Sequence, residues 1–376
     1  MHKNLTALLG AGASASCGLP TMWAFVDEWL DRKDEQSQLP LAHWILRGWG
    51  HPGHATPQHD LEGLLTILQD LSEQERPTGT SFGIELGVGS LHYPWVRARH
   101  YLDEQVGFKT QGHSAGRFRE WYTSDNPLID FVLSHESNKE WTWKYVPNEA
   151  RAIFNDLKEF MLTRLATVDS DQARNMFLEF LHLLLDDESR AYCFSLNYDL
   201  VLEDALNGSQ WVLERGFDHT GRWRGLDLNG SGRPKLILGK MHGSLDWTLD
   251  EHRQPIATAT KGRVPPETLV VYPVATKQWY RQPFFSLISS FSDRLMESDV
   301  LIIVGCSLRD EAIVSVVSDA CNRNKSLRLI VVSPRMSDLE VRQQLSLAAQ
   351  TIVRLINTRW LGPETVAALS AQIETA

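Results

Sequence analysis

LTALLGAGASASCGLP, residues Leu5–Pro20, sets the expected fold class of this chain. The apolar run at its start is typical of a buried strand, and Gly10, Gly12 and Gly18 follow. Met22–Leu30 then carries apolar residues at helical spacing. A strand, a glycine turn and a helix are typical of a doubly wound sheet, where glycines let the backbone approach a pyrophosphate at a helix N-terminus. Because the spacing is not G-x-G-x-x-G, a tight turn without a ligand is the alternative interpretation.

The second half of the chain alternates apolar strands with helices. Strands are expected in AYCFSLNYD, KLILGKMHGSLDW, ETLVVYPVA, VLIIVGCSLRD, LRLIVVSPR and TIVRLI. By contrast, 31–187 shows helical patterns such as DLEGLLTILQDL and no strand alternation. We predict an α/β fold, a Rossmann-like doubly wound parallel sheet formed by 1–30 and 188–376, with a large mainly helical insertion at 31–187.

Composition excludes several classes of protein. The 376 residues are 43% hydrophobic and 22% charged, which is ordinary for a globular chain. No stretch approaches the roughly 18 apolar residues of a membrane-spanning helix, and the N-terminus lacks the apolar core of a secretory signal. The formal net charge of -10 argues against nucleic acid as a primary ligand of the chain alone. We expect a cytoplasmic protein without a membrane partner.

Cysteine and histidine usage predicts no bound metal. The four cysteines are scattered and form no C-x-x-C pair, so neither a four-cysteine zinc site nor a disulfide framework is expected. The stretch His51–His59 is rich in histidine, but a Pro/Gly-rich loop does not supply zinc geometry unaided. A solvated loop is the preferred interpretation of that stretch.

Four polar clusters follow predicted strands, at the carboxyl ends that meet along one edge of a parallel sheet. They are Gly10–Ser14, Ser195–Asp199, Met241–Ser244 and Gly305–Asp310. Polar groups at such ends cost folding free energy unless they are satisfied or solvated, so four together favour a functional site.

In this order, GAGAS…GLP, SLNYD, KMHGS and GCSL resemble the motifs of the sirtuin family. The resemblance covers the start of the chain and about residues 191–335. It departs from deacylating sirtuins, which have a four-cysteine zinc ribbon and an arginine soon after Gly-x-Pro, where this chain has Thr21-Met22-Trp23. NYDLVLEDAL and HGSLDW look more like the bacterial sirtuin-like NADases of anti-phage defence. The resemblance therefore implies hydrolysis of NAD+ to nicotinamide and ADP-ribose, with NAD as substrate and no metal.

Roles follow for the matched residues. Asn197 would hold a ribose hydroxyl and water, His242 would accept a proton, and Asp199 would orient its neighbours or stabilise positive charge. The expected nucleotide-binding residues are Gly10, Ala11, Gly12, Ser14, Ser195, Gly305, Ser307 and Ser333. The alternatives are a hydrogen-bonded strand-end histidine for His242 and helix capping for Asn197 and Asp199.

Such an enzyme would be toxic if unregulated, so the resemblance also implies control by assembly. The expected partners are further copies of the chain, a HerA-like ATPase or a short Argonaute. Three other functions stay open: an NAD- or ADP-ribose-binding regulatory module without catalysis, a subunit of a nuclease complex, and protein deacylation. For protein deacylation, the chain lacks the four-cysteine zinc ribbon of deacylating sirtuins.

Overall fold

The computed structural model describes residues 4–32, 61, 64, 65, 68, 72, 141–228, 233–258, 268–271, 281–360 and 362–375. The chain divides into two compact units. Unit 1 consists of Met1–Thr21, Leu162–Tyr272 and Gln278–Ala376, and unit 2 of Met22–Met161 and Pro273–Lys277.

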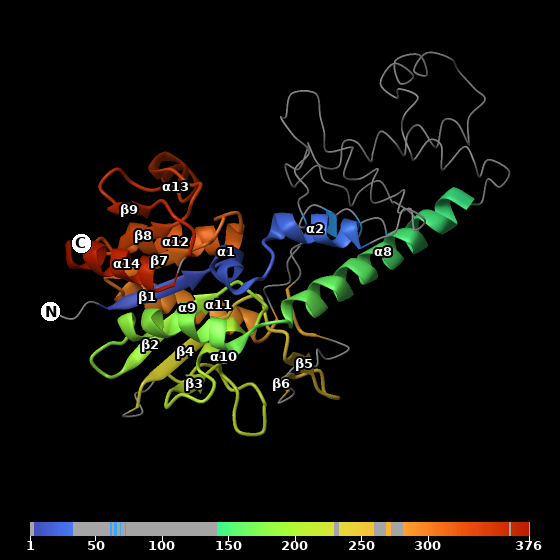
Figure 1. The fold of residues 1–376 in the computed structure, drawn as a ribbon, viewed down its shortest axis with the longest axis horizontal. Helices are drawn as coiled ribbons and strands as arrows, with labels where there is room; N and C mark the ends of the chain where they lie inside the picture. The colour runs from blue at the N-terminus through green and yellow to red at the C-terminus, as the bar shows by residue number, and fades with distance from the viewer. Residues whose placement is uncertain are drawn as a thin grey trace, which may run out of the picture. The chain divides into compact units, whose positions relative to one another are not determined.

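Within the described residues, seven strands of unit 1 form one sheet in the order β3-β4-β2-β1-β7-β8-β9 (Figure 1). Every neighbouring pair in it is parallel. The strands are β1 Leu5–Leu9, β2 Arg190–Ser195, β3 Val212–Glu214, β4 Lys235–Lys240, β7 Val300–Val304, β8 Arg328–Val332 and β9 Val353–Ile356. This arrangement confirms the predicted α/β class with a Rossmann-like doubly wound parallel sheet.

The central strands β1 and β7 are mostly apolar and buried because both of their faces are covered. All five residues of β7 are buried, and so are all five of β1. One face of the sheet packs against α11 Phe284–Glu297, α12 Glu311–Arg323 and α13 Asp338–Gln344, whose buried residues share one apolar core with Leu8 and Ile303. In a second group of helices, α10 Val201–Ala205 and α14 Pro363–Thr375 both pack against α9 Ser170–Leu183.

Unit 2 contains α2 Met22–Asp31 and most of α8 Trp141–Leu165. The two helices are joined by a hydrogen bond from Trp29 Nε1 to Asp156 Oδ2 (2.6 Å) and by an edge-on contact of Phe25 with Phe160. Leu61, Leu64, Leu65 and Leu68 are helical and buried, at the spacing of an amphipathic helix. α9 lies within the predicted insertion 31–187 but belongs to unit 1 together with the sheet.

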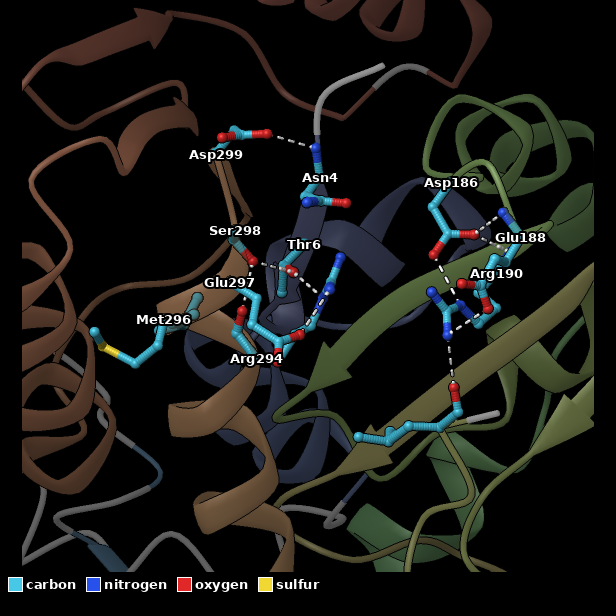
Figure 2. Close-up of polar contacts among 12 residues, drawn as sticks. Asn4, Thr6, Asp186, Glu188, Arg190, Arg294, Met296, Glu297, Ser298 and Asp299 are labelled. Atoms are coloured by element: carbon cyan, nitrogen blue, oxygen red, sulfur yellow. Dashed lines mark hydrogen bonds and ion pairs between the residues drawn. The ribbon is translucent and has the colours of Figure 1, made fainter. Parts of the chain in front are cut away.

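The amino-terminal edge of the sheet holds a buried cation, Arg294 of α11 (Figure 2). Its Nε donates to Thr6 Oγ1 (3.2 Å), and its guanidinium carbon lies 3.7 Å from the centre of the Tyr192 ring. Ser298 Oγ pairs with Thr6 Oγ1 (2.7 Å). Burial lowers the pKa of Arg294 from its ordinary value. This cluster ties α11 to β1 and β2 at the end of the strands opposite the predicted site.

Some details differ from expectation. The expected strand in ETLVVYPVA is wrong for its described part, because residues 268–271 contribute a single bridge between Gly243 and Val270. Two short antiparallel strands, β5 Trp247–Leu249 and β6 Pro255–Ala257, were not predicted. In the described parts of the chain, we find no helix with the length and apolar character needed to cross a bilayer.

Candidate functional site

The strand order of the sheet reverses between β1 and β7. From β1 the chain continues to β2 and β4 on one side, and β7, β8 and β9 lie on the other. In open α/β sheets, ligands bind outside the carboxyl ends of the strands at such a switch point. Two glycine turns lie here: Gly10–Ser14 follows β1, and Gly305–Leu308 follows β7.

The two turns pack backbone against backbone. Gly10 N–H donates to the Val304 carbonyl (2.9 Å), and Gly12 N–H donates to the Gly305 carbonyl (2.9 Å). A Cβ atom on Gly12 would lie 2.8 Å from Gly305 Cα, and one on Gly305 would lie 2.3 Å from Ala13 N. Gly305 also has a φ of +61°. Glycine is therefore required at both positions by the contact between the turns themselves.

The turn after β7 also contains a non-glycine residue with a left-handed backbone. Leu308 has a φ of 53°, which a side chain bearing a Cβ rarely adopts. Its side chain is buried in the apolar core, whereas Ser307 beside it is exposed. Burial of the Leu308 side chain in the core holds the turn in this conformation. Two residues further on, Asp310 is the N-cap of α12.

Asn197 ties the end of β2 to the turn after β1. Its Nδ2 donates to the Gly10 carbonyl (3.0 Å) and to Ser14 Oγ (3.0 Å), and its backbone N–H donates to Ser195 Oγ (3.1 Å). Both amide hydrogens of the side chain are thus used within the protein. Oδ1, with two acceptor lone pairs, is the group that Asn197 brings to a ligand.

Asp199 is a buried carboxyl beside the same turn. Its Oδ1 accepts a hydrogen bond from the N–H of Val201 (3.1 Å), the first residue of α10, whereas the N-cap position itself is Leu200. Burial raises the pKa of Asp199, opposed by the Lys240 ammonium and by a hydrogen bond from the Ser14 hydroxyl. Since Ser14 Oγ also accepts from Asn197, the three side chains form one hydrogen-bonded chain.

A buried group of charged side chains supports the loop 197–199 from behind. Lys240, 2% exposed, donates to the Asp199 carbonyl and lies 3.4 Å from Glu203 Oε1. Arg215 contacts the same Glu203 oxygen (3.3 Å) and Asp246 Oδ2 (2.7 Å). Because Lys240 is the last residue of β4, this network fixes the loop relative to the strand that precedes His242.

His242 is held by its backbone and by the glycine that follows it. The Val271 N–H donates to the His242 carbonyl (2.7 Å), and the Tyr198 hydroxyl donates to the Val271 carbonyl (2.5 Å). Gly243 has a φ of +90°, and a Cβ there would lie 2.2 Å from the Leu269 carbonyl oxygen. The His-Gly pair is thus required by close packing of the segment 268–271.

The imidazole of His242 pairs with Asp310, an interaction that sequence analysis missed. His242 Nε2 lies 3.0 Å from Asp310 Oδ2, and both side chains are about nine-tenths buried. Asp310 Oδ1 meanwhile accepts from the N–H groups of Ala312 (3.1 Å) and Ile313 (3.2 Å). In the sequence, Asp310 ends the polar cluster Gly305–Asp310, and no partner is predicted for it. Its place five residues after Gly305, at a carboxyl end of the sheet, was the available signal.

The remaining predicted residues are spread over the same edge. Ser195 is buried, and its hydroxyl accepts from Asn197. Ser333 follows β8, and its hydroxyl accepts from the Arg335 and Met336 amides (3.4 and 3.3 Å). Ala11 is the first residue of α1 Ala11–Ser14. The structure thus brings Gly10, Ser14, Asn197 and Asp199 into direct contact.

No disulfide joins the four cysteines, all of which are buried. Among the described residues, no group of three or more His, Cys, Asp or Glu side chains is arranged to hold a metal ion. The histidine-rich stretch His51–His59 lies outside the described residues.

Residues 192–356 match the model of the SIR2-like domain. The matched part runs from β2 to β9 and includes Asn197, His242 and Asp310. A comparison with curated proteins gives no match.

Several solved structures are similar over almost the whole chain. A Sir2 homologue in complex with NAD is 13% identical, with 99% of this chain and 89% of that chain covered and a TM-score of 0.42. A mutant Sir2 homologue in complex with 2′-O-acetyl ADP-ribose is 14% identical, with 99% and 92% covered and a TM-score of 0.42. The match to the SIR2-like domain thus lies in residues 192–356, somewhat less than half of the chain.

Proposed function

We propose that this protein hydrolyses NAD+ to nicotinamide and ADP-ribose. The observation that carries the proposal is the binding of the Asn197 amide, at the end of β2, to the turn after β1 beside the switch point of the sheet. It is supported by the SIR2-like domain match and by His242 at the end of the next strand, β4.

Hydrolysis of the nicotinamide–ribose bond needs little acid catalysis from the protein, because nicotinamide leaves as a neutral base. The bond between C1′ of the ribose and the nicotinamide nitrogen breaks with its electron pair going to nicotinamide. A water molecule then adds to C1′, and its proton passes to His242. General-base help of this kind is worth about 100- to 10,000-fold in rate.

Asn197 is assigned to the ribose and the attacking water, through Oδ1. With both of its N–H groups bonded to Gly10 and Ser14, the amide cannot rotate without breaking two hydrogen bonds, so the acceptor is preorganised. Asp199 holds Ser14 and the start of α10 in place, an orienting role rather than one in contact with substrate.

The nucleotide phosphates are assigned to the turn after β1. The Gly10, Gly12 and Ala13 amides donate to Val304, Gly305 and Gly10 carbonyls, so they already have partners. The Ala11 amide, at the first position of α1, has no carbonyl to bond within the helix and suits an anion. We assign Ser307 to the nucleotide near this turn and Ser333 to its adenosine half.

Incubation of the purified protein with NAD+, followed by chromatography of nicotinamide and ADP-ribose, tests the proposal. Asn197→Ala and His242→Ala should each abolish release while the circular dichroism spectrum stays unchanged. Two matched controls should keep turnover: His252→Ala, which removes an exposed histidine, and Asn324→Ala, whose amide bonds carbonyls at the opposite end of the strands. Retention of intact NAD+ without release would instead favour the regulatory binding module.

We further infer that the enzyme acts in the bacterial cytoplasm as an anti-phage effector that depletes NAD+, and that assembly controls it. The inference rests on the resemblance of its motifs to sirtuin-like NADases. The assembly is with further copies of the chain or with a partner such as a HerA-like ATPase or a short Argonaute. Size-exclusion chromatography and pull-down with the neighbouring gene products test this, and a fully active lone monomer contradicts it.

A further inference from the structure

The carboxyl of Asp310 has two acceptor oxygens that face different elements. Oδ1 receives the Ala312 and Ile313 amides of α12, and Oδ2 lies 3.0 Å from His242 Nε2. An ionised carboxylate only accepts hydrogen bonds. The pairing therefore places the imidazole proton on Nε2, and in the neutral ring Nδ1 then carries the lone pair.

We propose that Asp310 is the positioning residue that sets the tautomer of His242 and makes Nδ1 the atom that accepts the substrate proton. This inference rests on the proposed function, because it gives His242 the role of base. Its geometry is independent of that function. The contact links the end of β4 to the start of α12 across the carboxyl edge of the sheet.

Capping of α12 makes the proposal sharply testable. In Asp310→Asn, the amide must keep its oxygen toward Ala312 and Ile313, because two N–H donors face it there. Its NH2 group then points at His242 and donates to Nε2. The ring is forced to carry its proton on Nδ1, which removes the basic atom. Since Asn is as good an N-cap as Asp, α12 and the fold are retained.

Asp169→Asn is the matched control. Asp169 is the N-cap of α9, and its Oδ1 likewise accepts from two amides, those of Asp171 and Gln172 (2.9 and 3.1 Å). The same chemical change at this cap alters no histidine contact of the site. This variant therefore measures how loss of a capping charge alone affects the histidine signals and the rate of nicotinamide release.

The test uses the full chain labelled with 15N-histidine, with the His242 signals identified by their loss in His242→Gln. We expect the wild-type ring to show the Nε2–H tautomer and Asp310→Asn to show the Nδ1–H tautomer. In parallel, kcat for nicotinamide release should fall about 100- to 10,000-fold, the usual worth of a general base, with KM for NAD+ nearly unchanged. Asp169→Asn should change neither signal nor rate.

Three results would overturn the inference. The first is a wild-type ring protonated on Nδ1, and the second is an unchanged tautomer in Asp310→Asn. The third is a switched tautomer with wild-type kcat. If the tautomer switches as expected but the wild type releases no nicotinamide, the proposed function fails, and with it any catalytic role of the pair.

Discussion

Glycine-to-alanine substitutions in and beside the two packed turns should separate two ways of lowering the free energy of unfolding: a steric clash and an unfavourable backbone conformation. Gly305→Ala places a Cβ 2.3 Å from Ala13 N at a φ of +61°, so it suffers both. Gly12→Ala has no positive φ and meets Gly305 Cα at 2.8 Å, so its cost is steric. Gly18→Ala has a φ of +77° with nothing within 4 Å, so its cost is conformational. The chain thus supplies its own controls.

The expected loss in free energy of unfolding for each variant follows from these contacts. A left-handed conformation costs an L-residue about 1–2 kcal/mol, the value expected for Gly18→Ala. Overpacking costs about 1–3 kcal/mol, the value expected for Gly12→Ala. Gly305→Ala should lose the sum, about 2–5 kcal/mol, and should move the turn that carries Ser307 and Asp310.

Urea unfolding followed by circular dichroism gives the free energy of unfolding of each variant, compared at a common slope. Nicotinamide release reports whether the turns still meet. Equal destabilisation by Gly305→Ala and Gly18→Ala would refute the claim that these glycines exist to let one turn pack on the other.

Three further substitutions or reactions have definite outcomes. Lys240→Met should lower the free energy of unfolding by about 3–5 kcal/mol in urea melts, because it leaves Glu203 and two loop carbonyls short of a buried partner; a change under 1 kcal/mol would show that the network adds nothing. Arg294→Met should stay within about 1 kcal/mol of wild type, since the loss of its contacts with Thr6, Tyr192 and Glu297 is offset by removal of a buried charge with an unbonded nitrogen. Burial raises the pKa of Cys17 to about 11, so about one thiol in a thousand is ionised at pH 8. Iodoacetamide should therefore label Cys17 slowly in the native protein and faster as pH rises toward 11, whereas rapid labelling at pH 8 would contradict its burial.

Most of the sheet could be predicted from sequence because its strands are short apolar runs bounded by polar residues. β1 and β7 are buried on both faces, and such strands read as continuous hydrophobic segments. A polar cluster follows each of these runs directly, so the end of the strand can be placed from the sequence. The order of clusters along the chain therefore placed Asn197 and His242 at one edge.

The pairings at that edge could not be predicted. Whether the Asn197 amide turns toward α10 or back to Gly10 depends on the contact between neighbouring strands β1 and β2, which local pattern does not contain. Likewise, Asp310 has the sequence signature of an N-cap, and its second oxygen meets His242 only because the start of α12 and the end of β4 come together. The sequence pattern therefore predicts which residues lie at this edge, but their hydrogen-bond partners depend on packing between segments far apart in the chain.

Comparison of nicotinamide release by the wild type, Asn197→Ala, His242→Ala and the double variant tests the central claim most directly. If both side chains act on one linkage, the wild type yields nicotinamide and ADP-ribose in equal amounts, each single variant loses at least about 100-fold, and the double variant is little worse than either. Near wild-type turnover in either folded single variant, or multiplicative losses in the double variant, would contradict the account.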